Sequence, residues 1–337
     1  MLEHWVNALQ RVGLSWPIPF LRLCAGQEVG EQLKAIWLLI GVPGLAIMAF
    51  LWAWQIGASQ IHTSLGTVPG PRQVWQESLA LLQDHRIERA KAREFYQRQE
   101  ERNARRLAAD ATATVRIVAW TGKPTLIDQI VTSLRTVFTG FLLATLIAVP
   151  LGLLSGSSRI IQAALNPVIQ VFRPVSPLAW LPIVTIVVSA VYVTAEDGWF
   201  EKSFLISAIT VTLCSLWPTL INTAVGVSSV PQDLLNVSKV LQLRWSTTVA
   251  KIVLPAALPF IFTGMRLSLG VGWMVLIAAE MLAQNPGLGK FVWDEFQNGS
   301  SQSLGRIMVA VLAIGLLGFM LDRLMLSCQQ LVTRTAQ

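Results

Sequence analysis

The sequence predicts an all-α membrane protein with six transmembrane helices. Of its 337 residues 53% are apolar and only 13% are charged, and the mean hydropathy is +0.55. That balance is too apolar for a soluble domain with a single core. The apolar residues gather in six runs that are long enough, or nearly so, to cross a hydrocarbon core of about 30 Å. These runs are Ala35–Trp54, Thr132–Leu154, Leu178–Val193, Phe204–Val227, Phe260–Leu282 and Leu304–Met325, of which the third is the shortest and the most interrupted by proline.

The segment before the first run, residues 1–34, mixes charges, Pro17 and Pro19 with apolar residues. It has no clean hydrophobic stretch followed by small residues, so we expect no cleaved signal peptide and a first span, 35–54, that stays in the protein. Either a short helix at the lipid headgroups or an unstructured tail fits residues 1–34. Pro43 and Gly44 predict a bend within the first span.

A long polar insertion, residues 55–128, follows the first span. Its stretch Gln83–Ala109 is a dense mix of Glu, Arg, Gln and Ala, with pairs such as Glu94 and Arg98 four residues apart. That composition predicts a solvated helix or helical hairpin. The arginines fit a contact with a partner or an anion, but a solvated face is the more common meaning of such a charge run and is favoured here.

The short connections between the other runs fix the expected orientation. Their basic residues fall on one side of the membrane if both ends of the chain are cytoplasmic. We therefore expect a cytoplasmic 1–34, a periplasmic 55–128, a five-helix core over 129–328 and a cytoplasmic tail, 329–337. The insertion is basic as well, but long loops are translocated largely regardless of charge. The basic residues of the short connections are Arg159, Arg173, Lys239, Arg244, Lys251, Arg323 and Arg334.

The stretch Pro231–Leu243 predicts a short amphipathic helix joined closely to the span at Phe260–Leu282. Apolar residues recur at helical intervals beside polar ones, while Pro231 and Asp233 suit the first turn of a helix. Composition alone fits two roles. The helix either rests on the lipid surface or inserts into a groove of a partner protein.

The same stretch carries a family resemblance. Asn236-Val-Ser238, then Gln242, then Ile252-Val-Leu-Pro255 keep the spacing of the signature of ABC-importer permeases of the type I fold: Glu-Ala-Ala, three residues, Gly, nine residues, Ile-x-Leu-Pro. Asn236 stands where the family usually has Glu, Val237 and Ser238 where it has Ala, and Gln242 where it has Gly. Three further stretches resemble the nitrate/sulfonate/bicarbonate group, and the similarity runs from about 129 to 325. These stretches are Arg173–Pro182, Ser215–Thr223 and Ala278–Leu282.

The resemblance implies a permease of the bacterial inner membrane that works by alternating access. It implies a second permease copy, expected to be identical, two cytoplasmic ATP-binding subunits and a periplasmic substrate-binding protein. Residues 231–243 would be the cytoplasmic coupling helix. Among substrates of the group nitrate is favoured over nitrite, bicarbonate and cyanate, with sulfonates such as taurine as the alternative. The expected contacts to the ATPase are Asn236, Val237, Ser238, Lys239, Leu241 and Gln242.

Two groups of residues are candidates for a translocation pathway. Arg266, Trp273 and Glu280 recur every seven residues and so share one helix face. An ionisable residue at mid-depth costs about 3 kcal/mol, so it faces either protein or a water-filled path, and both roles stay open. A separate stripe of small residues, at 264, 268 and 272, predicts close helix packing. Prolines 174, 177 and 182 break the third run. The second group of candidates is expected near this break, and its residues could either bind an oxyanion or pack against other helices. These residues are Trp180, Trp217, Thr219 and Asn222.

Other chemistries are not expected from this chain. Gly287-Leu-Gly289-Lys290 resembles the end of a phosphate-binding loop, but Phe291 replaces the required Ser or Thr, so ATP and Mg²⁺ should bind to partner subunits. The three histidines lack metal-ligand spacing, and no nucleophile grouping is seen, so we predict neither an enzyme nor a cofactor or metal site. The net charge of +7 is spread over many connections, which favours lipid headgroups over nucleic acid.

Two rival classes remain. A secondary transporter would be expected to show two similar halves with paired broken helices, and no convincing repeat is present. A membrane scaffold or sensor built on 55–128 would keep its function when residues 231–243 are changed.

Overall fold

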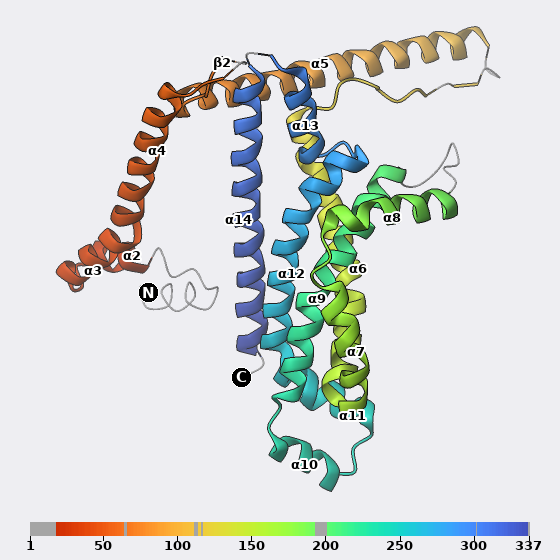
Figure 1. Ribbon diagram of the computed structural model, residues 1–337. Coiled ribbons are helices and arrows are strands. Elements are labelled where there is room, and N and C mark those ends of the chain that lie inside the picture. Colours follow the sequence, from red (N-terminus) through yellow and green to blue (C-terminus); the bar gives the residue numbers. More distant parts are fainter. Residues whose placement is uncertain are drawn as a thin grey trace.

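The computed structural model describes residues 18–63, 66–110, 114–115, 117–192, 201–300 and 302–335. Within these residues the regular secondary structure is helical apart from one hairpin of two short strands, β1 (His62–Thr63) with β2 (Gly66–Thr67). The helices, in chain order (Figure 1), are α2 (Ile18–Cys24), α3 (Val29–Ile36), η1 (Trp37–Gly41), α4 (Val42–Gln60), α5 (Pro71–Ala109), α6 (Leu126–Ser157), α7 (Arg159–Phe172), α8 (Pro177–Val191), α9 (Lys202–Ser228), α10 (Gln232–Val240), α11 (Trp245–Thr248), η2 (Val249–Val253), α12 (Leu254–Ala283), α13 (Leu288–Asn298) and α14 (Ser303–Thr335).

Five continuous helical segments of the described chain are long and apolar enough to cross a membrane. Helices α7 and α8 meet at a bend of 101°, and they supply the sixth span only if the bent pair is counted as one. The predicted third run, Leu178–Val193, overlaps α8 alone, and its last residue lies outside the described residues, so the structure differs here from a straight span. Pro174 and Pro177 explain the break, because proline lacks an N–H and disfavours helical geometry in the residue before it. The five segments are Val29–Gln60, Leu126–Ser157, Lys202–Ser228, Trp245–Ala283 and Ser303–Val332.

Helix α9 lies at the centre of the bundle, between α6 and α12. Small residues let the backbones approach, because a Cβ on Gly140 would lie 2.7 Å from the Ala208 carbonyl oxygen and one on Gly152 2.8 Å from that of Leu220. On the other side, a Cβ on Gly264 would lie 2.9 Å from the Cα of Thr219. The close packing predicted for the stripe at 264, 268 and 272 is thereby confirmed.

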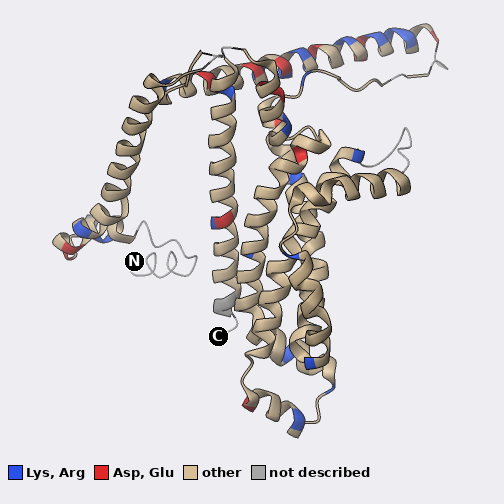
Figure 2. Ribbon diagram, in the orientation of Figure 1, with Lys and Arg blue, Asp and Glu red and all other residues tan. Residues whose placement is uncertain are grey.

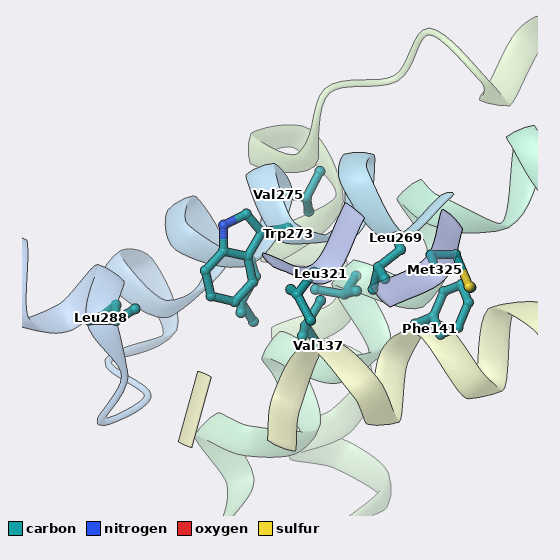
Figure 3. Close-up of a cluster of buried hydrophobic side chains, with 10 residues drawn as sticks. Val137, Phe141, Leu269, Trp273, Val275, Leu288, Leu321 and Met325 are labelled. Carbon is teal, nitrogen blue, oxygen red and sulfur yellow. The ribbon is translucent and has the colours of Figure 1, made fainter. Parts of the chain in front are cut away.

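Helix α14 covers α12 on the outside of the bundle. Figure 3 shows the apolar cluster beneath it, in which Leu321 and Met325 of α14 meet Leu269 and Trp273 of α12. Phe141 joins the cluster from α6. Val211 of α9 belongs to the same buried cluster. Helices α6, α9 and α12 therefore form one packed frame, which α14 covers.

Helix α5 is a single helix of 39 residues, not a hairpin, and it crosses one end of the bundle (Figure 1). Arg306 at the start of α14 holds it through ion pairs to Glu77 at 3.9 Å and Asp84 at 3.5 Å, and also pairs with Glu295 of α13 at 3.4 Å. Beyond the bundle, charges of both signs line its outer half (Figure 2). The chain folds back along this half, where the Val118 N–H donates to the side-chain oxygen of Gln99.

The first span stands apart from the bundle in Figure 1, and none of its apolar window is buried within the chain. Its helix starts at Val29, six residues before the predicted span, and contains the π-helical turn η1 just before Pro43. A second π-helical turn, η2, precedes Pro255 in the same way. A π-helical turn before a proline accommodates the proline ring and the hydrogen bond that is lost with its N–H. Apolar side chains such as Trp37 and Phe50 are exposed and are available to contact lipid or another chain.

Candidate functional site

Helix α10 projects from the end of the bundle opposite α5 (Figure 1). Its bounds, Gln232–Val240, lie within the predicted 231–243. The tip is apolar and exposed: Val240 is 81% exposed and Leu241 62%. Exposed apolar residues gathered on one short helix mark a surface for another molecule.

The predicted contact residues divide into two sets. Ser238 is buried, and its hydroxyl donates to the Leu235 carbonyl at 2.7 Å. It therefore stabilises α10 itself. The other five side chains are exposed and available to a partner, namely Asn236, Val237, Lys239, Leu241 and Gln242.

The end of α10 explains one letter of the family signature. Gln242 adopts a left-handed conformation with φ of 49°, and the Leu243 N–H donates to the Ser238 carbonyl at 3.0 Å. The Gln242 N–H donates to the Lys239 carbonyl, also at 3.0 Å. This is a Schellman-type helix end, at which glycine is preferred because it has no Cβ. The signature glycine thus corresponds to a backbone shape that this chain makes with glutamine.

Helix α10 is tied firmly to the spans. Leu235 packs against a buried cluster that contains Val227 of α9 and Ala257 and Ile261 of α12. Beyond Arg244 the chain is helical without interruption from Trp245 to Ala283. A force on α10 therefore reaches α9 through side-chain packing and α12 through both packing and the backbone.

Arg266 and Trp273 attach α12 to α14. Arg266 donates two hydrogen bonds to Asp322, from Nε to Oδ1 at 2.5 Å and from Nη2 to Oδ2 at 2.8 Å. A bidentate pair of this kind neutralises both charges within the span. The Trp273 indole donates to the Ile314 carbonyl at 3.0 Å, where Gly318 makes room for the ring. These contacts are packing contacts between two spans.

Glu280 is fully buried and organises the start of α13. Its carboxylate accepts from the Ser133 hydroxyl at 2.8 Å and from the Gly289 N–H at 2.9 Å, while the Leu288 N–H donates to Ser133 Oγ at 2.8 Å. A Cβ on Gly287 would collide with the carboxylate. The run that resembles a phosphate-binding loop therefore does surround an acidic group at a helix start, but that group is a side chain of the same protein.

Thr219 is fully buried where α9 crosses α12. Pro218 interrupts α9, and the Ser268 hydroxyl of α12 takes a place in its hydrogen-bond ladder. It accepts from the Thr219 N–H at 3.1 Å and donates to the Ser215 carbonyl. Asn222 donates to the Pro218 carbonyl at 2.8 Å. The structure places Thr219 and Asn222 at a helix contact, where Thr219 is fully buried and Asn222 is half-buried.

Trp180 and Trp217 both contact Phe172 near the break between α7 and α8. Both rings stack on Phe172, with centroid distances of 5.6 Å and 6.5 Å. Both indole N–H groups are buried and have no hydrogen-bond acceptor among the described residues. Three helices, α7, α8 and α9, contribute to this aromatic stack.

A cavity of about 700 Å³ lies beside the stack, between α7 and α9. Sequence reasoning missed its polar wall, because Arg159–Phe172 was treated as a connection between spans. The signal was present in the polar positions 162, 166, 170 and 173, which are spaced by four, four and three residues. The lining residues are Ser155, Gln162, Asn166, Ile169, Gln170, Arg173, Pro174, Leu220, Ile221, Ala224 and Val225.

Comparison with known proteins places this geometry in a family. Residues 148–334, more than half of the chain, match the model of the binding-protein-dependent transport system inner membrane component. The chain is 39% identical over 209 residues to the nitrate import permease protein NrtB of a Synechocystis species, a match that covers 62% of this chain and 70% of that protein. It is 33% identical over 294 residues to the bicarbonate transport system permease protein CmpB of Synechococcus elongatus, covering 87% and 89%. A match to NrtB of Synechococcus elongatus is 36% identical over 205 residues and covers 61% and 69%. The chain therefore belongs to the family of binding-protein-dependent transport system inner membrane components, the permeases of ABC importers.

Proposed function

We propose that this chain is the membrane-spanning subunit of an ATP-driven importer of a small inorganic anion, with nitrate as the first candidate and bicarbonate as the second. The observation that carries the proposal is α10, an exposed apolar helix packed through Leu235 onto α9 and α12. The substrate class rests on the relatives, which are named for nitrate and bicarbonate. Those names give no support to the sulfonate alternative.

The proposed assembly contains two copies of this chain, two ATP-binding subunits and a substrate-binding protein, in a bacterial plasma membrane. The α10 end faces the cytoplasm together with both termini, and α5 lies on the periplasmic side. The described ends of the chain lie on the α10 side of α5 (Figure 1), which supports placing both termini on the same side of the membrane as α10. The unburied first span and the exposed apolar faces of α8 support contacts with lipid and a second copy.

The proposed mechanism separates hydrolysis from transport. Partner subunits bind and hydrolyse ATP, and this chain converts their motion into alternating access. Closure of the ATPases displaces α10, and the cluster around Leu235 passes the displacement to α9 and α12. Because α9 is packed closely on both α6 and α12, these spans move together instead of deforming separately.

The test is uptake by the purified complex in proteoliposomes, with ATP inside and binding protein outside. We expect uptake of labelled nitrate, weaker or no uptake of bicarbonate, and none of taurine. Leu241→Glu places a charge on the apolar tip of α10 and is expected to abolish ATP-dependent uptake. Gln232→Glu adds the same charge at the exposed first turn of α10, where the helix dipole favours it, and is expected to preserve uptake.

Two results would contradict the proposal. One is that no ATPase purifies with this chain and that uptake proceeds without ATP. The other is unchanged uptake by the Leu241→Glu complex, which would show that α10 is not the element that couples ATP to transport.

A further inference from the structure

Helix α7 has a polar face that its surroundings do not explain. Its outer face is apolar and exposed, as at Ile160 and Val171. The side chains at 162, 166 and 170, followed by Arg173 at the helix end, instead line the cavity shared with α9. Residues three and four apart lie above one another on a helix, so these four groups form a ladder along one wall.

The ladder reaches the interior of the membrane. Helix α7 follows α6 at the α10 end of the bundle, and its 14 residues rise by about 21 Å. The hydrocarbon core is about 30 Å thick. Arg173 also follows Phe172, which stacks on Trp217 in the middle of α9. An arginine at that depth faces protein, water or an anion, because lipid would oppose its charge.

The charge of Arg173 is not neutralised within the described chain. Arg173 has no ion-pair partner in the described chain, whereas Arg266 of α12 is paired with Asp322 of α14. The described lining of the cavity also contains no acidic side chain. Three carboxamides and a guanidinium supply several N–H donors, and a guanidinium presents two of them in the geometry that the oxygens of a planar oxyanion accept.

We infer that the α7 ladder, Gln162, Asn166, Gln170 and Arg173, is the anion-selecting passage of this permease, with Arg173 as its only described cation. The inference rests on the proposed import of a small oxyanion and assigns that substrate a site. Carboxamides hydrogen-bond an anion without trapping it, so a single arginine combined with amides allows both entry and release. The shared chemistry is a small oxyanion, and an anionic lipid headgroup could present the same group.

The first experiment measures uptake and ATPase activity of the assembled importer. Arg173→Gln removes a charge-assisted hydrogen bond and is expected to lower nitrate uptake about tenfold or more. ATP hydrolysis stimulated by the binding protein should persist, because α10 is unchanged. Arg173→Lys should restore part of the uptake. Parent-level uptake by Arg173→Gln would overturn the inference. An equal loss of uptake and of ATPase activity would also overturn it, because such a loss indicates a structural role for Arg173.

The second experiment reads the cavity directly. Ile221→Cys on the α9 wall, in a chain whose three native cysteines are replaced, is labelled with an anionic thiol reagent in phosphatidylcholine nanodiscs. Nitrate should slow labelling in this chain, but not in one that also carries Arg173→Gln. Gln297→Cys, exposed on α13, is the control and should show no protection.

Lipid composition separates the two sources of oxyanion. Protection that needs phosphatidylglycerol and ignores nitrate would assign the cavity to a headgroup and overturn the passage. If the parent complex imports no anion, the proposed function fails, while nitrate protection at 221 still decides whether the ladder binds the anion.

Discussion

Three polar residues of the α6–α9–α12 frame and two of the arm formed by α7 and α8 have different surroundings. In the frame, Glu280, Thr219 and Ser268 are fully buried and hydrogen-bonded. In the arm, Asn166 and Arg173 face a cavity, and the helix breaks beside them. A polar residue within a span is therefore not by itself a sign of a transport path. Glu280, Thr219 and Ser268 stabilise the frame through hydrogen bonds within the chain. Asn166 and Arg173 line a cavity and are available to a substrate.

The largest expected effect tests the frame at Glu280. Glu280→Ala would leave the Ser133 hydroxyl and the Gly289 N–H without their buried acceptor, at a cost of about 2–4 kcal/mol of folding free energy. Glu280→Gln keeps an acceptor oxygen and should cost less. Thermal unfolding of the detergent-solubilised permease measures both. Equal stability of Glu280→Ala and the parent would contradict a structural role.

A second change tests the packing of α6 on α9. Gly152→Val introduces a Cβ 2.8 Å from the Leu220 carbonyl oxygen, and such overpacking costs about 1–3 kcal/mol. Gly270→Val is the matched control, because a Cβ there meets nothing within 4 Å. The yield of monodisperse protein in gel filtration should fall only for Gly152→Val. A similar fall for both variants would show that the close approach is not what matters.

The sequence predicts the frame better than it predicts the arm. Long apolar runs mark α6, α9, α12 and α14, because hydropathy alone identifies straight spans. The polar ladder lowers the hydropathy of α7, so the same criterion conceals the helix that lines the cavity. Periodicity also misleads at α12: Arg266 and Glu280 share a face, but the first meets α14 and the second meets α6 and α13. Their partners depend on where distant helices lie, which no local pattern specifies.

A third prediction compares one substitution in the arm with one in the frame. Asn166→Leu removes an exposed amide that bonds no buried group, so the free energy of unfolding should change by less than about 0.5 kcal/mol. Nitrate uptake should nevertheless fall, because the amide ladder is interrupted. Ser268→Ala should do the reverse, with a loss of about 1–2 kcal/mol at the Pro218 kink and uptake that follows the amount of folded protein. If Asn166→Leu destabilises the protein more than Ser268→Ala does, the comparison fails.

The smallest effect lies at the end of α10. Gln242→Gly relieves a left-handed conformation that a side chain disfavours, and it should stabilise the helix end by about 0.5–1 kcal/mol. Hydrogen exchange of the amides of Leu241 and Leu243 should slow. Gln242→Val, which is β-branched, should accelerate it. Faster exchange in the glycine variant would show that the side chain of Gln242 holds the turn.

In the proposed mechanism α10 passes the motion of an ATPase to the spans, and a site-specific photo-crosslink from α10 shows whether the two subunits are in contact there. A crosslinking residue at Val237 should capture the ATP-binding subunit in the assembled complex, whereas one at Val187, on the exposed face of α8, should not. Capture of only lipid or of the substrate-binding protein from Val237 would contradict the claim.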